Sequence, residues 1–225
     1  MSKRLLVACE GPTDFVVIQA AADAILGEYV PVLLQPEVCV AGGHGKLGGG
    51  WKGVRDWCRQ TRAQGGIGQL AEDEDVVVIH LDADVADDGE VDCAQPCPPP
   101  SDTTGALAAI ALDWLGEAHL PARSTFCMPS KCTEAWVLAG LFVGNPIVGQ
   151  GIECRPEPEA LLVRQPPDLK FVRKHGGRYR KNRPIYDAHR SSIASAWLTI
   201  EHQCTQAKAF GDALRAAFAA TAQER

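Results

Sequence analysis

Residues 76–84 read Val-Val-Val-Ile-His-Leu-Asp-Ala-Asp, a mostly apolar run that ends in two aspartates. A strand this apolar is typical of the centre of a parallel sheet, where both faces are covered. Asp82 and Asp84 follow it directly. Ligands of open α/β sheets bind at the edge where the strands reach their carboxyl ends, so these two carboxylates are the first candidate site residues.

Strand and helix patterns alternate on both sides of this run. We expect strands at 4–9, 38–41, 76–81 and 124–128, and helices at 15–26, 51–62, 105–118 and 133–142. The last of these helices is expected to be capped by Thr133. This order of elements predicts an α/β fold with a parallel sheet flanked by helices.

The composition changes near residue 145. Residues 145–167 contain five prolines, a basic segment follows, and residues 191–222 have helical spacing of apolar residues. We therefore expect an α/β catalytic domain over 1–145 and a basic, helical C-terminal appendage over 146–225.

The chain has 225 residues, a formal net charge of -6, and nine cysteines. An acidic chain is a poor general binder of nucleic acid, so a phosphate-rich partner needs a local basic patch or bound metal ions. The first apolar run is too short for a signal peptide and no stretch is long enough to span a membrane, which predicts a cytoplasmic protein. The cysteine spacing favours buried free thiols over zinc sites or disulfides.

A second acidic group follows the first predicted strand, in the sequence Glu10-Gly11-Pro12-Thr13-Asp14. In a doubly wound sheet it would share one edge with Asp82 and Asp84. Carboxylates so close together repel one another unless a cation joins them, and hard oxygen ligands suit Mg²⁺ or Mn²⁺. Asp14 alone has a simpler interpretation, because an acidic residue stabilises the first turn of a helix.

These motifs resemble a known family. Glu-Gly-x-Thr-Asp after a first strand, with Asp-x-Asp after a later one, is similar to the Toprim fold of topoisomerases, bacterial primases and OLD-family nucleases. The resemblance covers about residues 4–140. The Ser-x-x-x-Glu pattern from Ser130 to Glu134 resembles the extra acidic position of OLD-type nucleases, and small stand-alone Toprim-like proteins of bacteria are the most similar group.

The resemblance implies a Mg²⁺-dependent endonuclease that acts on DNA or RNA, in phage defence or repair. Glu10 would be the catalytic glutamate and would share the metal site with its ligands Asp82 and Asp84, while Asp14 and Glu134 would complete the site or supply a second one. Relatives of this kind often act beside a separately encoded ABC-type ATPase, which is the implied partner. The chain lacks the large DNA-gating parts of topoisomerases and the zinc-binding part of primases.

The basic segment from Lys170 to Arg190 carries eight Lys and Arg residues against one acid, Asp187. With aromatic residues interleaved, it favours contact with a phosphate backbone, although a solvated loop or a subunit interface would show the same pattern. The residues expected to bind nucleic acid are Lys46, Lys170, Arg173, Arg178, Arg180, Lys181 and Arg183. By the resemblance, one lysine stabilises the transition state; the sequence leaves Lys170, Lys174 and Lys181 open, and Lys174 is taken as the working candidate.

Lys46 belongs to a glycine-rich loop over 42–50 that does not match the phosphate-loop pattern of ATPases, because Leu47 stands where Ser or Thr is required. The glycine-rich loop is therefore interpreted either as a phosphate-binding loop, in which Lys46 contacts the phosphate, or as a plain surface loop.

Two other functions remain open. Asp82-Ala83-Asp84 fits the opening motif of haloacid-dehalogenase-type phosphatases, but that motif lies near the N-terminus in those enzymes and here no Asp-Asp pair follows residue 88. The chain could also be a non-catalytic partner subunit of a defence complex. The pattern is equally compatible with DNA and RNA and with any oligomeric state.

Overall fold

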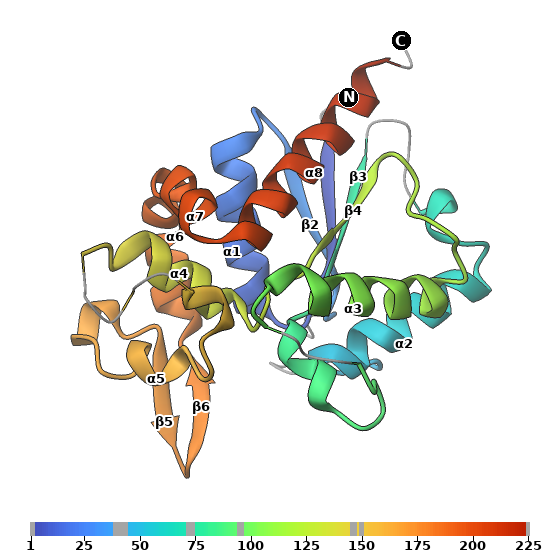
Figure 1. Cartoon of the computed structure of the whole chain (residues 1–225). Helices are drawn as coiled ribbons and strands as arrows, with labels where there is room; N and C mark the ends of the chain where they lie inside the picture. The colour runs from blue at the N-terminus through green and yellow to red at the C-terminus, as the bar shows by residue number, and fades with distance from the viewer. Residues whose placement is uncertain are drawn as a thin grey trace.

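The computed structural model of the chain describes residues 3–37, 45–70, 75–93, 97–144, 148 and 151–223. They form an α/β fold around a four-stranded sheet (Figure 1). The strands in chain order are β1 Arg4–Ala8, β2 Val30–Gln35, β3 Val76–His80 and β4 Ser124–Cys127. Their spatial order is β2-β1-β3-β4 and all neighbours are parallel. The expected α/β class with a Toprim-like parallel sheet is confirmed.

The two central strands are β1 and β3, and every residue of β3 is buried. The second strand differs from the expectation. It begins at Val30 and lies at the edge of the sheet, where Pro31 is tolerated because the outer side of an edge strand needs no ladder hydrogen bond. That proline hid the strand in the sequence. The segment expected to form the second strand, 38–41, lies outside the described residues.

Helices cover both faces of the sheet. α1 Pro12–Ile25 lies on one face, and α2 Gly50–Ala63 and α3 Pro100–Leu115 lie on the other (Figure 1). Alternate residues of β1 show the two layers, because Leu5 and Val7 pack on the α1 side and Leu6 and Ala8 on the α2–α3 side. The chain thus leaves β1 in one direction and β3 in the other, which makes their carboxyl ends the switch point where ligands bind in such folds.

The last helix before residue 145 is α4 Thr133–Leu141. The expected cap at Thr133 is wrong: Cys132 is the residue before the first turn, and the Thr133 side chain makes no cap hydrogen bond. The Thr133 hydroxyl donates to the Asp14 carboxylate instead, and so joins α4 to α1 at the end of the sheet.

After residue 150 the chain packs back onto the α1 side of the sheet. Its elements are α5 Glu159–Leu162, β5 Val172–His175, β6 Arg178–Lys181, α6 Arg183–Ser195, α7 Trp197–Gln203 and α8 Thr205–Gln223. Short 3-10 turns stand at Ile67–Gln69, Ala83–Asp87, Ile152–Cys154 and Pro167–Leu169. Phe171, Tyr186 and Trp197 belong to the same hydrophobic cluster as Leu5 and Val7.

The basic segment contains an antiparallel hairpin that the sequence analysis missed. β5 and β6 pair from Val172 with Lys181 to His175 with Arg178, and Gly176 and Gly177 form the turn, both with positive φ. Two glycines between short strands are a known hairpin signal. Here it was obscured because the strands carry charged residues in place of alternating apolar ones. The hairpin projects from the body of the protein (Figure 1).

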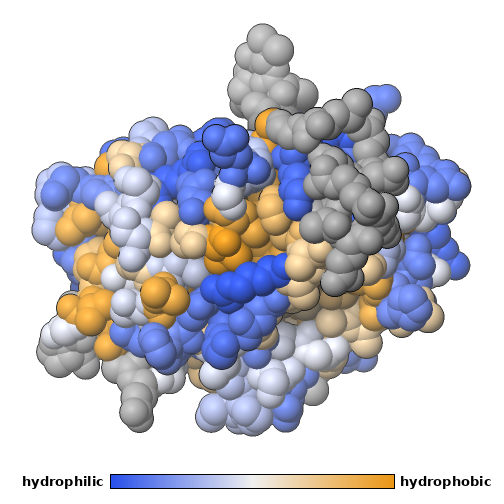
Figure 2. All heavy atoms as spheres, turned by 90° about the horizontal axis from the view of Figure 1, so that it is seen from above, coloured by the Kyte–Doolittle hydropathy of each residue, from blue (hydrophilic) through white to orange (hydrophobic). Residues whose placement is uncertain are grey.

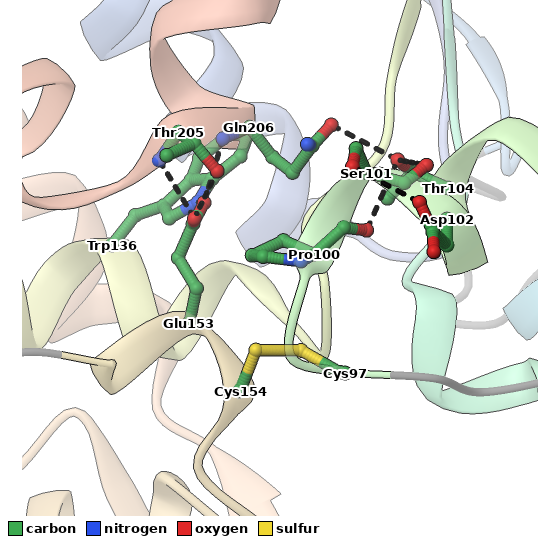
Figure 3. Close-up of a disulfide and its surroundings, with 10 residues drawn as sticks. All are labelled: Cys97, Pro100, Ser101, Asp102, Thr104, Trp136, Glu153, Cys154, Thr205 and Gln206. Carbon is green, nitrogen blue, oxygen red and sulfur yellow. Dashed lines mark hydrogen bonds between the residues drawn. A yellow bond between two sulfur atoms is a disulfide. The ribbon is translucent and has the colours of Figure 1, made fainter.

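A disulfide joins Cys97 to Cys154, against the expectation of free thiols throughout (Figure 3). The two residues are 57 positions apart, with Cα atoms 5.4 Å apart, so no spacing rule could pair them. The bond ties the segment before α3 to the turn that holds Glu153. That buried carboxylate accepts hydrogen bonds from the Thr205 and Gln206 backbone amides at the start of α8, at 2.7 and 2.9 Å.

Six further described cysteines are free, and most are buried as expected, including Cys9 and Cys127. None of the described helices combines the length and the hydropathy needed to cross a membrane. The end of the molecule opposite the hairpin is shown in Figure 2, where hydrophilic residues surround apolar ones near the middle of the face.

Candidate metal centre

The carboxyl ends of the two central strands meet at Glu10 and Asp82. Glu10 follows β1, and its Oε1 accepts a hydrogen bond of 2.8 Å from the Asp82 backbone amide, which follows β3. The structure therefore brings together two residues 72 positions apart in the chain. Asp84 lies two residues further on, in the short 3-10 turn that begins after Asp82, and lines the same pocket.

Asp14 joins them from the first turn of α1. Gly11, in an extended conformation, and Pro12 begin the helix, and the buried Asp14 carboxylate contacts neighbouring elements. Its Oδ1 accepts hydrogen bonds from the Thr133 hydroxyl at 2.8 Å and from the Lys181 ammonium at 2.9 Å. Because both partners lie on other elements, Asp14 does more than stabilise its own helix.

Lys181, the last residue of β6, places its ammonium group among three carboxylates. Besides its contact with Asp14, Nζ lies 3.1 Å from Glu134 Oε2 and 3.8 Å from Asp82 Oδ2. Three carboxylates that would otherwise repel one another are thus held around one positive charge.

Glu134 stands in the first turn of α4 and is fully buried. The Tyr186 hydroxyl of α6 donates to its Oε1. Its carboxylate also belongs to a group with the Cys132 thiol and the Glu159 carboxylate, in which one potential ligand atom from each residue lies within 4.8 Å of the others. Neither Cys132 nor Glu159 was among the site residues expected from the sequence.

His80 is a further residue that the sequence analysis missed. It is the last residue of β3, has no exposed surface, and places Nε2 3.1 Å from Asp82 Oδ1. Potential ligand atoms of Asp14, His80 and Asp82 all lie within 4.8 Å of one another. The signal was present, because His80 is the one polar residue inside an otherwise apolar strand and stands two positions before Asp82, on the same side of the strand.

The electrostatics of the group follow from this crowding. Burial, together with the charges of Asp82 and Asp14, raises the pKa of Glu10 well above its ordinary value. The pKa of Asp84, which lines the same pocket, is raised to about 7, first by loss of solvation of its carboxyl group and then by the charge of Asp82. Burial alone would raise the pKa of Asp14, but the Lys181 ammonium holds it below its ordinary value.

The pKa values of the two basic partners are raised, although burial by itself would lower them. Burial disfavours the charged forms of Lys181 and His80. Even so, Asp14 and Glu134 raise the pKa of Lys181 well above its ordinary value, and Asp82 raises the pKa of His80. The site as a whole holds more carboxylates than cations, and a divalent cation would relieve their repulsion.

The donor set fits such a cation. Among the described residues, His80 Nδ1 is buried without a hydrogen-bond partner, and His80 Nε2, Asp82 Oδ1 and Glu134 Oε2 are buried in ionic contacts of 3.1 Å that lack hydrogen-bond geometry. Buried polar atoms normally have a hydrogen-bond partner, and carboxylate oxygens and imidazole nitrogens are common metal ligands.

The working candidate for the catalytic lysine, Lys174, lies away from the carboxylates. Lys174 pairs in register with Tyr179 toward the exposed end of the hairpin, and its ammonium lies 5.2 Å from the centre of that ring. Lys181, on the same face but at the base of the hairpin, is the lysine that contacts the carboxylates. The alternation of charged residues made the two lysines equivalent in the sequence, and only the position of the turn separates them.

The other predicted basic residues fall into two groups. Arg180 and Arg183 line the pocket of about 490 Å³ that holds Glu10, Asp14, Asp82 and Asp84. Outside that pocket lining stand Lys46, Lys170, Arg173 and Arg178. Lys46 is exposed in the turn before α2, and residues 42–44 of its glycine-rich loop lie outside the described residues.

The chain matches no protein-family model, no curated protein and no solved structure, so the resemblance to Toprim proteins rests on the residues quoted above.

Proposed function

We propose that the protein is a metal-dependent nuclease that hydrolyses phosphodiester bonds in DNA or RNA. The observation that carries the proposal is the meeting of Glu10 and Asp82 at the switch point of the sheet, with Asp14 and Asp84 in the same pocket. A cluster of carboxylates at this edge, beside a strongly basic hairpin, suits a phosphate-bearing substrate held by both metal and cations.

Asp14, Asp82 and Asp84, with Glu134 behind them, would hold one or two Mg²⁺ or Mn²⁺ ions. When bound, such ions polarise a phosphate oxygen and lower the pKa of a coordinated water. Glu10, whose pKa is raised by its burial and by neighbouring acids, is suited to exchange a proton with the attacking water near neutral pH.

The cations of the hairpin have separate tasks. Lys181, which reaches the carboxylates, would stabilise negative charge on the phosphate undergoing attack. Arg180 and Arg183 at the pocket would orient the flanking phosphates. The exposed Arg173 and Arg178 lie on the opposite side of the hairpin from Lys181 by the alternation of strand residues, where they would track the nucleic-acid backbone further from the pocket.

A haloacid-dehalogenase-type phosphatase is less well supported. In that mechanism an aspartate must attack the substrate phosphorus directly. Asp82 is only 5% exposed and faces His80 and Lys181, so its carboxylate is better placed as a ligand than as a nucleophile. A non-catalytic partner subunit would retain the same cluster without cleavage.

One assay separates these functions. Purified protein is incubated with supercoiled plasmid, with single-stranded RNA and with p-nitrophenyl phosphate, in Mg²⁺, in Mn²⁺ and in a chelator. The proposal predicts metal-dependent cleavage of a nucleic acid, lost in Glu10→Gln and kept in Asp113→Asn, which removes an exposed carboxylate on α3. Hydrolysis of p-nitrophenyl phosphate alone would favour the phosphatase, and no hydrolysis of any substrate would favour the partner subunit.

A further inference from the structure

His80 has the burial and the polar surroundings of a metal-binding histidine. Its side chain is fully buried at the end of the central strand β3. Nδ1 has no hydrogen-bond partner among the described residues, and Nε2 meets only Asp82 Oδ1, 3.1 Å away and outside hydrogen-bond geometry. A neutral imidazole carries one donor and one acceptor, and leaving one of them unpaired in the interior is costly. A strand core would more simply hold another valine at this position.

The ring points into the carboxylate cluster. Nε2 lies 3.1 Å from Asp82 Oδ1, and that oxygen is also buried without a hydrogen-bond partner. The charged groups that interact with the ring are Asp82, Asp14 and Lys181. The imidazole and the two carboxylates therefore offer one nitrogen and two oxygen atoms that all lie within 4.8 Å of one another.

We propose that His80 is a direct metal ligand, and that together with Asp14 and Asp82 it makes this centre select a first-row transition ion such as Mn²⁺, Co²⁺ or Zn²⁺ over Mg²⁺. This inference rests on the proposed metal-dependent function and concerns which ion the site takes. Mg²⁺ prefers oxygen ligands in a near-octahedral shell, whereas imidazole nitrogen favours the transition ions. The adjacent Cys132 thiol, close to Glu134 and Glu159, adds sulfur to the same pocket and shifts the preference in the same direction.

The test reads metal coordination itself. Mn²⁺ is bound to the wild-type protein, and electron spin-echo envelope modulation is recorded to detect nitrogen coordinated to the ion. The proposal predicts modulation from ¹⁴N in the wild type, its loss in His80→Gln, and its retention in His119→Gln, which replaces an exposed histidine after α3. Calorimetric titration with each ion alone supplies a second readout. The ratio of Mn²⁺ to Mg²⁺ affinity should fall at least about tenfold in His80→Gln, the lower end of what groups behind metal ligands contribute.

The wild-type spectrum decides the matter even if His80→Gln fails to fold. Bound Mn²⁺ without ¹⁴N modulation would overturn the inference. So would an unchanged affinity ratio in a folded His80→Gln variant, because His80 would then be an imidazolium that only pairs with Asp82. Cleavage of nucleic acid with no nitrogen signal would refute the ligand role of His80 and leave the nuclease proposal standing. A nitrogen signal with no cleavage in any metal would support the ligand role of His80 and refute the nuclease proposal.

Discussion

Replacing Lys181 with methionine removes one positive charge from the centre of the site while keeping the length of the side chain. The ammonium group lies 2.9 Å from Asp14 Oδ1, 3.1 Å from Glu134 Oε2 and 3.8 Å from Asp82 Oδ2. Without it, three largely buried carboxylates face one another. We therefore expect Lys181→Met to be destabilised far more than an ordinary surface variant.

The size of the effect follows from the burial of the pair. Removing one partner of a buried ion pair typically costs about 3–5 kcal/mol. The Lys181 side chain is 30% exposed, which places the expected loss near the lower end, about 3 kcal/mol. At about 3 kcal/mol per molar of urea, this corresponds to a fall of about 1 M in the unfolding midpoint.

Divalent cations should reverse the loss, because they supply the missing positive charge. A ligand at 100 times its dissociation constant adds about 2.7 kcal/mol to the free energy of unfolding. The gain from Mn²⁺ should be larger in Lys181→Met than in the wild type, where the ammonium group competes for the same carboxylates.

The assay is urea unfolding with and without Mn²⁺, with Lys174→Met as the matched control on the same face of the hairpin. Lys174→Met should behave as the wild type does. Equal stability of the two variants, or no extra gain from Mn²⁺ in Lys181→Met, would refute the account of Lys181 as the cation that holds the carboxylates together.

Three further outcomes are expected. Glu153→Gln, which weakens the acceptor at the start of α8, should lower the free energy of unfolding by about 1–3 kcal/mol in urea titrations; an unchanged midpoint would contradict this role. The pKa of Asp84 is about 7 in the folded protein, whereas its ordinary value is 3.8, so the folded protein keeps this proton at a higher pH. Stability without divalent cations should therefore fall as the pH rises through that interval, because the folded state binds more protons there, and Asp84→Asn should flatten the slope. Replacing Arg173, Arg178 and Arg180 with alanine should reduce the salt dependence of nucleic-acid binding by about 0.9 in log–log slope per lost phosphate contact, and identical slopes would remove the hairpin from the binding surface.

The parts of the fold that follow from local patterns could be predicted from the sequence. The apolar run of β3 predicts a central strand, because strands covered on both faces carry such runs. Gly11 and Pro12 end the first strand, and this places Glu10 and Asp14 at the same sheet edge as Asp82. The meeting of these three carboxylates needed no information beyond the order of strands and turns.

Long-range pairings were not accessible in the same way. Lys174 and Lys181 differ only in their distance from the Gly176-Gly177 turn, and that distance has meaning only once the hairpin is recognised. His80 was treated as a part of its strand because a sequence does not show that its ring faces Asp82 or that Nδ1 lacks a hydrogen-bond partner. Each of these features depends on which segments fold against one another, and the spacing of residues does not encode that.

The most direct test of the metal centre is the rate of nucleic-acid cleavage by the wild type and by Asp82→Asn as the Mn²⁺ concentration is raised. The two side chains have nearly the same shape, so the variant changes the charge of the candidate ligand and little else. The account predicts a wild-type rate that rises with Mn²⁺ to saturation, and a rate in folded Asp82→Asn that is lower by at least about a hundredfold, comparable to the loss of one electrostatic group in other active sites. Cleavage by the wild type that persists in a chelator, or an Asp82→Asn variant that cleaves at the wild-type rate, would contradict it.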